Sequence, residues 1–578
     1  MSGLAGWCGE RVEGALDAMD AAAPWRGPAV TRHRAARFEV IYRHHARPGQ
    51  APRVLVGATG AVTAVAGNLA PSSPDPAAEL DRRLAASDLG DLDGAFAAAR
   101  YADGALTLAV DPFGVGPLYW TEAAGTLYFA SDLGQIAALP HVGRDVDPAA
   151  IHAYLTFSFV PGANTLLRGV RRVLPGHLLR WRGPGTAEAV PWFQLHERVD
   201  PAFADPTAAV RAVRATAKDA IRRRLVGERP VAVFLSGGVD SSAVTAWLKL
   251  VGRDVTALSL DFGDASVERE QAAQVARALE VPHLWVPADG ARVGGVLDAL
   301  DRAMDLPFGD PVTGPQWLLA DAARTAGFEV VFNGEGGDQL FGGWTSKPMV
   351  AAAVYAGLYD DLTPEEEYLR AYHRFYGLED KLYTPSLAAR VGAPGARRAM
   401  LRAYLGDEST SFYLNRVRLA DLSLKGQFNI VPRAERIAAA HGLSLRMPLF
   451  DRRLAELAFQ LPPELKLHGA CEKYVFKLAL QGRLPDDVVW RRKFGMSVPV
   501  TDWLLGPASG GPGALTERMN DELSEASVRR RGWFQPGFVA QLRAGLDVAN
   551  ETRRRRVGEK LWALWTLERW ARRFLGAP

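Results

Sequence analysis

Short apolar runs, broken by glycine and proline, fill the first 195 residues of the chain. Residues 53–56, 106–110 and 127–130 are runs of this kind, with the length and flanking turn residues of β-strands. Helical patterns of any length are few in this part. The pattern therefore predicts a β-rich N-terminal domain.

The pattern changes after residues 195–206, a polar stretch punctuated by proline that predicts a linker. From Thr207 onward, strand-like and helix-like runs alternate. Strands are expected at 231–235, 255–261, 283–286 and 329–333, and helices between them include 269–279 and 316–326. Such alternation is typical of a doubly wound parallel sheet, which binds ligands at the carboxyl ends of its strands.

Beyond about Leu340 the pattern is mostly helical and ends in an amphipathic helix, rich in arginine and tryptophan, at 553–574. A chain of 578 residues is long enough for more than one domain. We therefore expect an α/β multi-domain protein, with a β-rich domain at 1–205 and a second domain at 206–578.

Composition narrows the classes of function. The apolar fraction of 48% and the charged fraction of 23% are those of a soluble globular protein. The net charge of +3 is too small for a general nucleic-acid binder. Neither a signal peptide nor an apolar stretch long enough for a membrane span is seen. The two cysteines, Cys8 and Cys471, favour a reducing compartment, so we expect a cytoplasmic enzyme.

The most informative motif follows the strand expected at 231–235. Residues 235–243 read Leu-Ser-Gly-Gly-Val-Asp-Ser-Ser-Ala, and a helix-compatible run begins at Ala243 and extends to Leu250. Gly237 and Gly238 leave room for a phosphate, which the N–H groups of a helix N-terminus would bind. Serine hydroxyls are additional donors at positions 236, 241 and 242. A carboxylate, Asp240, tolerates phosphates when a cation lies between them, so the loop predicts a nucleotide pyrophosphate with Mg²⁺. No Gly-Lys-Ser/Thr follows the glycines, so the motif differs from a Walker A loop.

With four further segments of the second domain, this loop resembles the asparagine synthetase superfamily. Residues 334–343 (Gly-Glu-Gly-Gly-Asp-Gln-Leu-Phe-Gly-Gly), 446–451 (Arg-Met-Pro-Leu-Phe-Asp), 472–474 (Glu-Lys-Tyr) and 491–495 (Arg-Arg-Lys-Phe-Gly) are similar to its signatures. The first domain is similar to class II glutamine amidotransferases at 92–96, 111–119 and 128–132. The resemblance implies an Ntn-type β sandwich followed by a parallel sheet of the adenine-nucleotide α-hydrolase type.

The resemblance also implies chemistry in which ATP activates a carboxylate as an acyl-adenylate and an amine then displaces AMP. Asp240 and Asp338 would hold Mg²⁺, and Lys493 would stabilise charge in both half-reactions. Glu335 is the candidate base for the attacking amine. The remaining ATP and pyrophosphate ligands expected are Ser236, Gly237, Gly238, Val239, Ser241, Ser242, Leu260, Gly334 and Lys473.

The chain departs from the resemblance at its N-terminus. Class II glutaminases use an N-terminal cysteine, but Ser2 stands at that position here. A serine hydroxyl is a much weaker nucleophile than a thiolate. Cys8 does not replace it, because cleavage before Cys8 would delete an edge of the domain. The glutamine-site segments are also altered: Arg26-Gly27-Pro28 lacks the following Asp-Gly. We expect this domain to have lost glutaminase chemistry.

Relatives with an inactive glutaminase domain close an amide within one substrate. The retained Glu335 favours a lasso peptide cyclase, which joins the N-terminal amine of a precursor peptide to an Asp or Glu side chain. Its expected partners are a leader-peptide-binding protein and a leader peptidase. An asparagine-synthetase-like ligase using free ammonia or another amine, a β-lactam synthetase type and a non-enzymatic scaffold that binds ATP or peptide are the alternatives. The insert between Leu340 and Tyr372 and the basic C-terminal helix are candidates for shaping a peptide-sized pocket.

Overall fold

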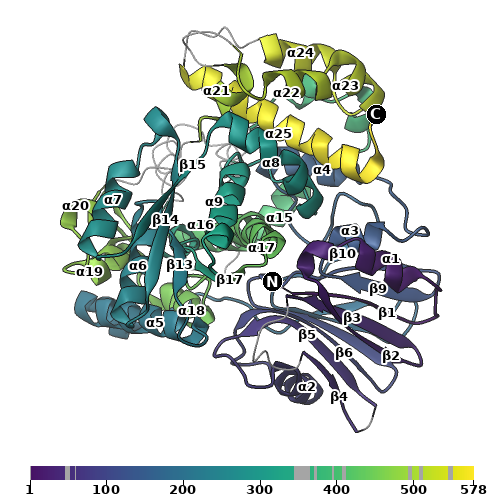
Figure 1. Ribbon diagram of the computed structural model, residues 1–578, viewed down its shortest axis with the longest axis horizontal. Coiled ribbons are helices and arrows are strands. Elements are labelled where there is room, and N and C mark those ends of the chain that lie inside the picture. The colour runs from purple at the N-terminus through teal and green to yellow at the C-terminus, as the bar shows by residue number, and fades with distance from the viewer. Residues whose placement is uncertain are drawn as a thin grey trace.

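The computed structural model describes residues 2–45, 53–58, 60–343, 363, 365–366, 368–369, 374–375, 377–392, 396–405, 410, 412–491, 498–506, 512–544 and 551–578. Lys493 and most of the insert between Leu340 and Tyr372 lie outside these residues. Figure 1 shows a β-rich part in purple and blue, an α/β part in teal, and helices in green and yellow.

The N-terminal part is a sandwich of two antiparallel sheets, each six-stranded within the described residues. The first has the order β10 (Arg171–Arg172), β8 (Tyr119–Ala123), β9 (Thr126–Ala130), β1 (Gly3–Cys8), β3 (Phe38–His44) and β2 (Ala29–Ala35). The second has the order β12 (Glu188–Pro191), β11 (His177–Trp181), β7 (Ala105–Val110), β6 (Gly94–Ala102), β5 (Val62–Leu69) and β4 (Val54–Val56). The predicted β-rich domain is confirmed.

The sandwich core forms where alternate side chains of both sheets meet. Phe38 and Val40 of β3 pack with Ala64 of β5 and Leu108 of β7, all buried. One expectation about this domain is wrong. Strand β1 is not an edge, since it pairs with β3 on one side and β9 on the other. Its residues are buried, so it belongs to the centre of the first sheet.

Helices cover the sandwich and lead to the next domain. They are α1 (Ala15–Ala21), η1 (Pro24–Arg26), α2 (Pro76–Ala86), α3 (Leu133–Ala137) and α4 (Pro148–Phe157). The expected linker contains η2 (Pro201–Ala204) and is bonded to α18 (Arg452–Gln460): the N–H groups of Arg198 and Asp200 donate to the carbonyls of Phe459 and Gln460. The linker is therefore fixed against the second domain.

The second domain is built on a parallel sheet with the order β15 (His283–Pro287), β14 (Val255–Asp261), β13 (Val231–Phe234), β16 (Val330–Phe332) and β17 (Ser444–Arg446). The predicted strands are confirmed to within a residue or two at their ends. Strand β17 was not predicted. The chain order reverses between β13 and β16, which is where ligands bind in such sheets.

Helices flank this sheet, as Figure 1 shows for α5, α6 and α7. They are α5 (Pro206–Arg224), α6 (Val239–Leu250), η3 (Gly263–Ala265), α7 (Arg269–Ala278), α8 (Gly290–Ala303) and α9 (Thr313–Thr325). Helix α6 begins at Val239, so Asp240, Ser241 and Ser242 lie in its first turn. Sequence alone placed the helix-compatible run four residues later, at Ala243.

The remaining part is mainly helical. It comprises α10 (Gly337–Phe341), α13 (Glu379–Leu382), α14 (Pro385–Ala388), α15 (Ala396–Leu405), α16 (Tyr413–Asp421), the π-helix η4 (Leu422–Ile430), α17 (Val431–Ala440), α18, η5 (Pro463–Leu465), the hairpin β18 (Leu467–His468) and β19 (Cys471–Glu472), α19 (Tyr474–Leu480), α20 (Asp486–Val489), α21 (Val500–Leu505), α22 (Thr516–Glu522), α23 (Glu525–Arg531), α24 (Pro536–Ala544) and α25 (Glu551–Leu575).

The predicted C-terminal helix is confirmed as α25. Its tryptophans Trp562, Trp565 and Trp570 are buried, and Tyr154 of α4 donates to its Ala563 carbonyl (2.8 Å). The helix therefore joins the two domains through packing. Among the described residues, no helix has the length and hydropathy needed to cross a bilayer.

Candidate active site

The Ser236–Ser242 loop lies between β13 and α6, at the carboxyl edge of the parallel sheet. Gly237 has a positive φ of 79°, and a Cβ there would approach the Ala272 backbone nitrogen to 2.7 Å. Only glycine fits this turn without strain. The turn places the first N–H groups of α6 at the sheet edge, the arrangement that binds phosphate.

The serines of the loop have different surroundings. Ser236 and Ser241 are linked by their hydroxyls (3.1 Å), and Ser241 is also bonded to the Ser236 N–H. Ser242 is fully buried and donates to the Gly238 carbonyl at 2.8 Å. We therefore assign Ser242 to shaping the turn, while the part-buried Ser236 is the better placed donor for a ligand.

The second signature packs directly on this loop. A Cβ on Gly334 would lie 2.5 Å from the Ser241 backbone nitrogen, and a Cβ on Gly337 would lie 2.3 Å from an Asp240 oxygen. Any larger residue would push the two segments apart. The glycines of residues 334–343 thus bring Asp338 beside Asp240, although the two are almost a hundred residues apart in the sequence.

Lys473 joins these two carboxylates. Its Nζ lies 2.5 Å from an oxygen of Asp240 and 2.5 Å from an oxygen of Asp338, and its side chain is 1% exposed. The two acids therefore converge on one cation, as a shared Mg²⁺ would require. Mg²⁺ is commonly held by one or two carboxylates together with nucleotide phosphates. No group of three or more His, Cys, Asp or Glu suited to a metal occurs among the described residues. The pair fits an ion whose other ligands are phosphate oxygens and water.

Glu335 heads a second polar cluster beside the first. The side-chain amide of Gln316, on α9, donates to the Glu335 carboxylate at 3.3 Å. Burial raises the pKa of Glu335, the nearby Arg433 opposes that rise, and the charge of Asp338 adds to it. A carboxylate with a raised pKa next to a phosphate loop is suited to accepting a proton from an amine.

Arg433, on α17, was not found by sequence reasoning. It donates from Nε to the Gln316 side-chain oxygen (3.0 Å) and from Nη1 to Asp310 (3.1 Å) and Asn429 (2.9 Å). Lys425 interacts electrostatically with both Asp310 and Glu335. Lys425 and Asn429 lie on the π-helix η4, which leads directly into α17. The π-helix is rare and is found frequently at functional sites.

The other predicted site residues have these positions. Val239 begins α6, and Leu260 lies at the carboxyl end of β14, beside β13. These positions do not show whether Val239 and Leu260 bind ATP, so both roles remain predictions. Lys493 lies outside the described residues. Arg491, just before it, donates to the Gly237 carbonyl at 3.3 Å, so the chain leading to Lys493 starts at the phosphate loop.

The N-terminal domain has a different arrangement around Ser2. The Ser2 hydroxyl accepts from the Gly67 N–H (3.1 Å), and the Ser2 carbonyl accepts from Arg26 (3.4 Å). Cys8 is buried, and burial raises the pKa of its thiol to about 12, so it is not a reactive thiolate. The expectation that Cys8 cannot substitute for the missing nucleophile agrees with these surroundings.

Arg26 is part of a buried ionic network between the domains. Its Nε donates to Asp132 at 2.8 Å, and its Nη1 also pairs with Glu435 of α17. Arg436, the next residue on α17, pairs with Asp132 and with Asp305. The exposed fractions of these side chains are 2% or less. Burial would raise the pKa of Asp132, but the charges of Arg26 and Arg436 outweigh it and lower that pKa.

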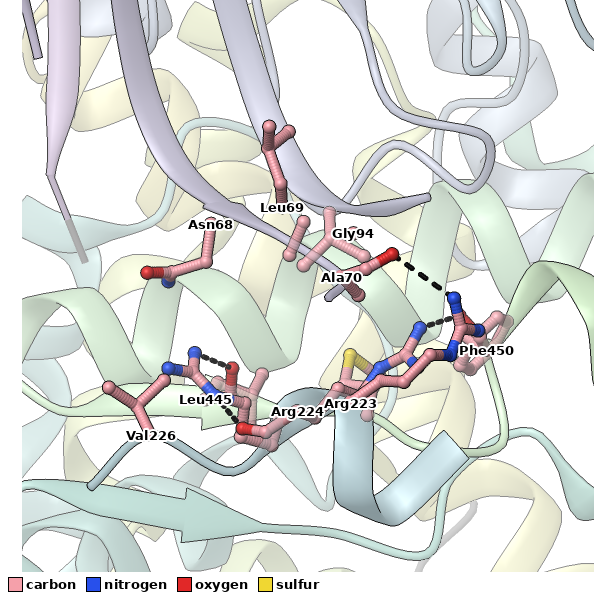
Figure 2. Close-up of a pocket in the computed structure, with 13 residues that line it drawn as sticks. Asn68, Leu69, Ala70, Gly94, Arg223, Arg224, Val226, Leu445 and Phe450 are labelled. Atoms are coloured by element: carbon pink, nitrogen blue, oxygen red, sulfur yellow. Dashed lines mark hydrogen bonds between the residues drawn. The ribbon is translucent and has the colours of Figure 1, made fainter. Parts of the chain in front are cut away.

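A small cavity also lies between the domains. Figure 2 shows Asn68, Leu69 and Ala70 facing Arg223, Arg224 and Leu445. Its volume of about 20 Å³ is room for one water molecule. Arg223 donates across it to the Ala70 carbonyl at 3.1 Å. This part of the boundary is therefore a packed contact and not a substrate site.

The fold and the site together define a nucleotide-binding α/β protein: a doubly wound sheet with a glycine-rich loop and two convergent carboxylates at its switch point. Comparison with known proteins gives the family. A model described as asparagine synthase matches residues 212–572, and a model described as a glutamine amidotransferase domain matches residues 82–192. The first match covers more than half of the chain, so the chain belongs to the asparagine synthase family.

The individual relatives share about a quarter of their residues with this chain over the matched regions. Asparagine synthetase [glutamine-hydrolyzing] 1 of Bacillus subtilis is 26% identical over 421 residues, which are 68% of this chain and 66% of the relative. Asparagine synthetase [glutamine-hydrolyzing] 3 of the same organism is 27% identical over 424 residues, 67% and 64% of the two chains. A Gibberella zeae protein named Amidase chry2 is 23% identical over 496 residues, 74% and 71%. The match thus spans just under two thirds of the length of the two synthetases.

Proposed function

We propose that the chain is an ATP-dependent carbon–nitrogen ligase that forms an amide through an acyl-adenylate. The observation that carries this proposal is the convergence of Asp240, Asp338 and Lys473 at the N-terminus of α6. That site combines backbone N–H groups and an ammonium for phosphate with two carboxylates for a cation. Membership of the asparagine synthase family supports the same chemistry.

The reaction has two steps. In the first, a carboxylate oxygen of the substrate attacks the α-phosphorus of ATP, the bond from that phosphorus to the bridging oxygen breaks, and pyrophosphate leaves. In the second, an amine nitrogen attacks the acyl carbon, the bond to AMP breaks, and the amide forms. The attacking amine loses a proton, which Glu335 accepts.

The residues of the site divide between these steps. Bound Mg²⁺, held by Asp240 and Asp338, would offset the charge that builds up on the phosphates. Lys473 would move from the two carboxylates to the phosphate oxygens, because its ammonium carries several donors on a flexible stem. Lys493 would follow the departing pyrophosphate. Gln316 holds Glu335 by one hydrogen bond and so orients the base.

At the finer level we propose macrolactam closure in a lasso precursor peptide, from its N-terminal amine to an Asp or Glu side chain. Two observations support an intramolecular amine over glutamine-derived ammonia. Ser2 replaces the cysteine nucleophile, and Arg26 is engaged by Asp132 and Glu435. The partners under this proposal are the precursor peptide, a leader-peptide-binding protein and a leader peptidase.

A second candidate is an asparagine-synthetase-like ligase that uses free ammonia. The names of the Bacillus subtilis relatives favour it. It shares the adenylation step and differs only in the acid and the amine.

ATP–pyrophosphate exchange tests the shared proposal. The purified full chain with Mg²⁺ is given a core peptide with glycine first and aspartate at position eight or nine, or free aspartate. Exchange with either acid supports the ligase, and loss of one water from the peptide by mass spectrometry supports the macrolactam. Exchange with aspartate and ammonia alone would favour the second candidate. Absence of exchange with every acid would make the chain a scaffold that binds ATP or peptide.

A further inference from the structure

We propose that Arg433 is the specificity-determining residue that binds the substrate's carboxylate before it is adenylated. This inference rests on the proposed function and deepens it, since it names the group that selects an acid over an amide. The argument starts from which atoms of the Glu335 cluster are engaged and which are open.

Arg433 is buried but incompletely paired. The residue is 3% exposed, and its Nε and Nη1 are taken by Gln316, Asp310 and Asn429. Its Nη2 makes no hydrogen bond to the described residues, and this atom is not fully buried. Nη2 therefore reaches accessible space, and it is a fixed, charged donor because the other two nitrogens are held.

The guanidinium that carries the open donor is linked to the candidate base by one side chain. Gln316 touches both Arg433 and Glu335, so one side chain separates the guanidinium from the candidate base. Glu335 also interacts with Asp338 of the phosphate loop cluster. A carboxylate bound to Nη2 would therefore lie close to the candidate base, which itself interacts with Asp338 of the phosphate site.

The charges around Arg433 suit an anion that is consumed by the reaction. Arg433 and Lys425 carry two positive charges, and Glu335 and Asp310 carry two negative charges. An incoming carboxylate adds one negative charge, which the two cations hold. Adenylation converts this carboxylate into a neutral acyl group, and the approaching ammonium then meets Glu335 and Asp310. The cluster can serve the acid first and the amine second without moving.

An amide substrate would fit the space but not the charge. Asparagine or glutamine in place of the acid offers Nη2 only a neutral carbonyl oxygen, so the bond to the guanidinium forms without the attraction between opposite charges. Losing one partner of a buried charge pair commonly weakens binding on the order of a hundredfold. Arg433 therefore sets selectivity for a free carboxylate independently of the size of the molecule that carries it.

The test measures binding and adenylation separately, in the full chain. Arg433→Gln, Arg433→Lys and the control Arg324→Gln are compared, since Arg324 is exposed on α9, the helix that carries Gln316. Calorimetry with a non-hydrolysable ATP analogue and Mg²⁺ present uses three probes: the Asp core peptide, its Asn counterpart and free L-aspartate. Exchange kinetics then give KM for the acid and for ATP.

We expect the wild type to bind the Asp peptide or aspartate on the order of a hundredfold more tightly than the Asn peptide. Arg433→Gln should abolish that preference and raise KM for the acid, with KM for ATP unchanged. Arg433→Lys should restore part of the preference, and Arg324→Gln should behave like the wild type. A merely structural role would change both KM values and would not depend on the probe.

Two results would overturn the inference. One is an Arg433→Gln protein that keeps the preference for acid over amide. The other is a wild type that binds neither acid probe. Failure of the proposed ligase is distinct, because it would show as normal selective binding with no pyrophosphate exchange.

Discussion

The two arginines Arg26 and Arg433 show how the two domains differ. Both are buried, and each is paired with a carboxylate: Arg26 with Asp132, and Arg433 with Asp310. The guanidinium of Arg26 donates hydrogen bonds to Asp132, Glu435 and the Ser2 carbonyl. Arg433 leaves Nη2 open. This difference matches the proposal that the site around Arg26 is structural and that the site around Arg433 binds a ligand.

The largest difference between the two sites is expected in enzyme activity, at the metal and phosphate cluster of the second domain. Asp338→Ala should lower pyrophosphate release between about a hundredfold and a thousandfold, because one electrostatic contribution to the transition state is lost. The measurement is ATP–pyrophosphate exchange on protein whose circular dichroism is unchanged. Asp264→Asn, an exposed position after β14, is the matched control and should keep full activity. A folded Asp338→Ala enzyme with near-normal exchange would remove Asp338 from the mechanism.

The next largest effect is expected on stability, from the network around Arg26. Asp132→Asn leaves Arg26 and Arg436 with less compensating charge in a buried site, which should cost about 3 kcal/mol of the free energy of unfolding. Denaturant titration measures it. The control is Asp17→Asn, which removes an exposed ion pair with Arg32 and should cost less than about 1 kcal/mol. Equal losses of unfolding free energy in both variants would mean that the buried network stabilises the fold no more than an exposed ion pair does.

Glu335→Gln should separate the two steps of the proposed reaction, adenylation and amide formation. The amide keeps the shape and loses basicity, so amide formation should slow about a hundredfold while adenylation continues. Hydroxylamine needs little help from a base, so hydroxamate should still form at nearly the wild-type rate. Parallel loss of hydroxamate and amide would deny Glu335 its role as base.

The same residue predicts a pH dependence. Glu335 must be ionised to accept a proton, and burial raises its pKa. Amide formation should therefore fall on the acid side at a higher pH than the pKa of about 4.3 of an ordinary glutamate would give. In Glu335→Gln this acid limb of the rate profile should disappear.

The smallest effect is expected at Ser2. Ser2→Ala should leave ligase activity unchanged, because the hydroxyl contacts only the Gly67 N–H within the described residues. Ser2→Cys should not create a glutaminase, since Arg26 remains engaged with Asp132 and Glu435. The measurement is glutamate release from glutamine, and robust turnover in either the wild type or Ser2→Cys would contradict the interpretation of a lost site.

Sequence reasoning succeeded where one short segment carries its own geometry. The run 235–243 contains a strand end, two glycines and a helix start, so its position at the sheet edge follows from local pattern alone. Strand β17 was missed because three residues, Ser444 to Arg446, give too little pattern to separate from the motif they belong to. The pattern predicted helix in this region but did not indicate that residues 422–430 form the π-helix η4.

The Glu335 cluster shows a different limit. Arg433 and Gln316 come from helices more than a hundred residues apart, and neither lies in a recognisable motif. A signal existed in the spacing: Lys425, Asn429 and Arg433 recur every four residues in an otherwise largely apolar stretch. This spacing indicates a polar face on a helix but does not identify the residues that the face contacts. The pairing of Asp132 with Arg436 likewise depends on how the domains pack.

The buried network has a consequence for whether the two domains can be separated. Glu435 and Arg436 lie on the same helix as Arg433, and their charges are neutralised by Arg26 and Asp132 of the N-terminal domain. Deletion of the N-terminal domain would leave the charges of Glu435 and Arg436 without their partners Arg26 and Asp132. Single substitutions that remove one charge at a time would each be harmful. The sandwich therefore provides the counter-charges of α17, and we expect the second domain to be unstable when it is produced without the first.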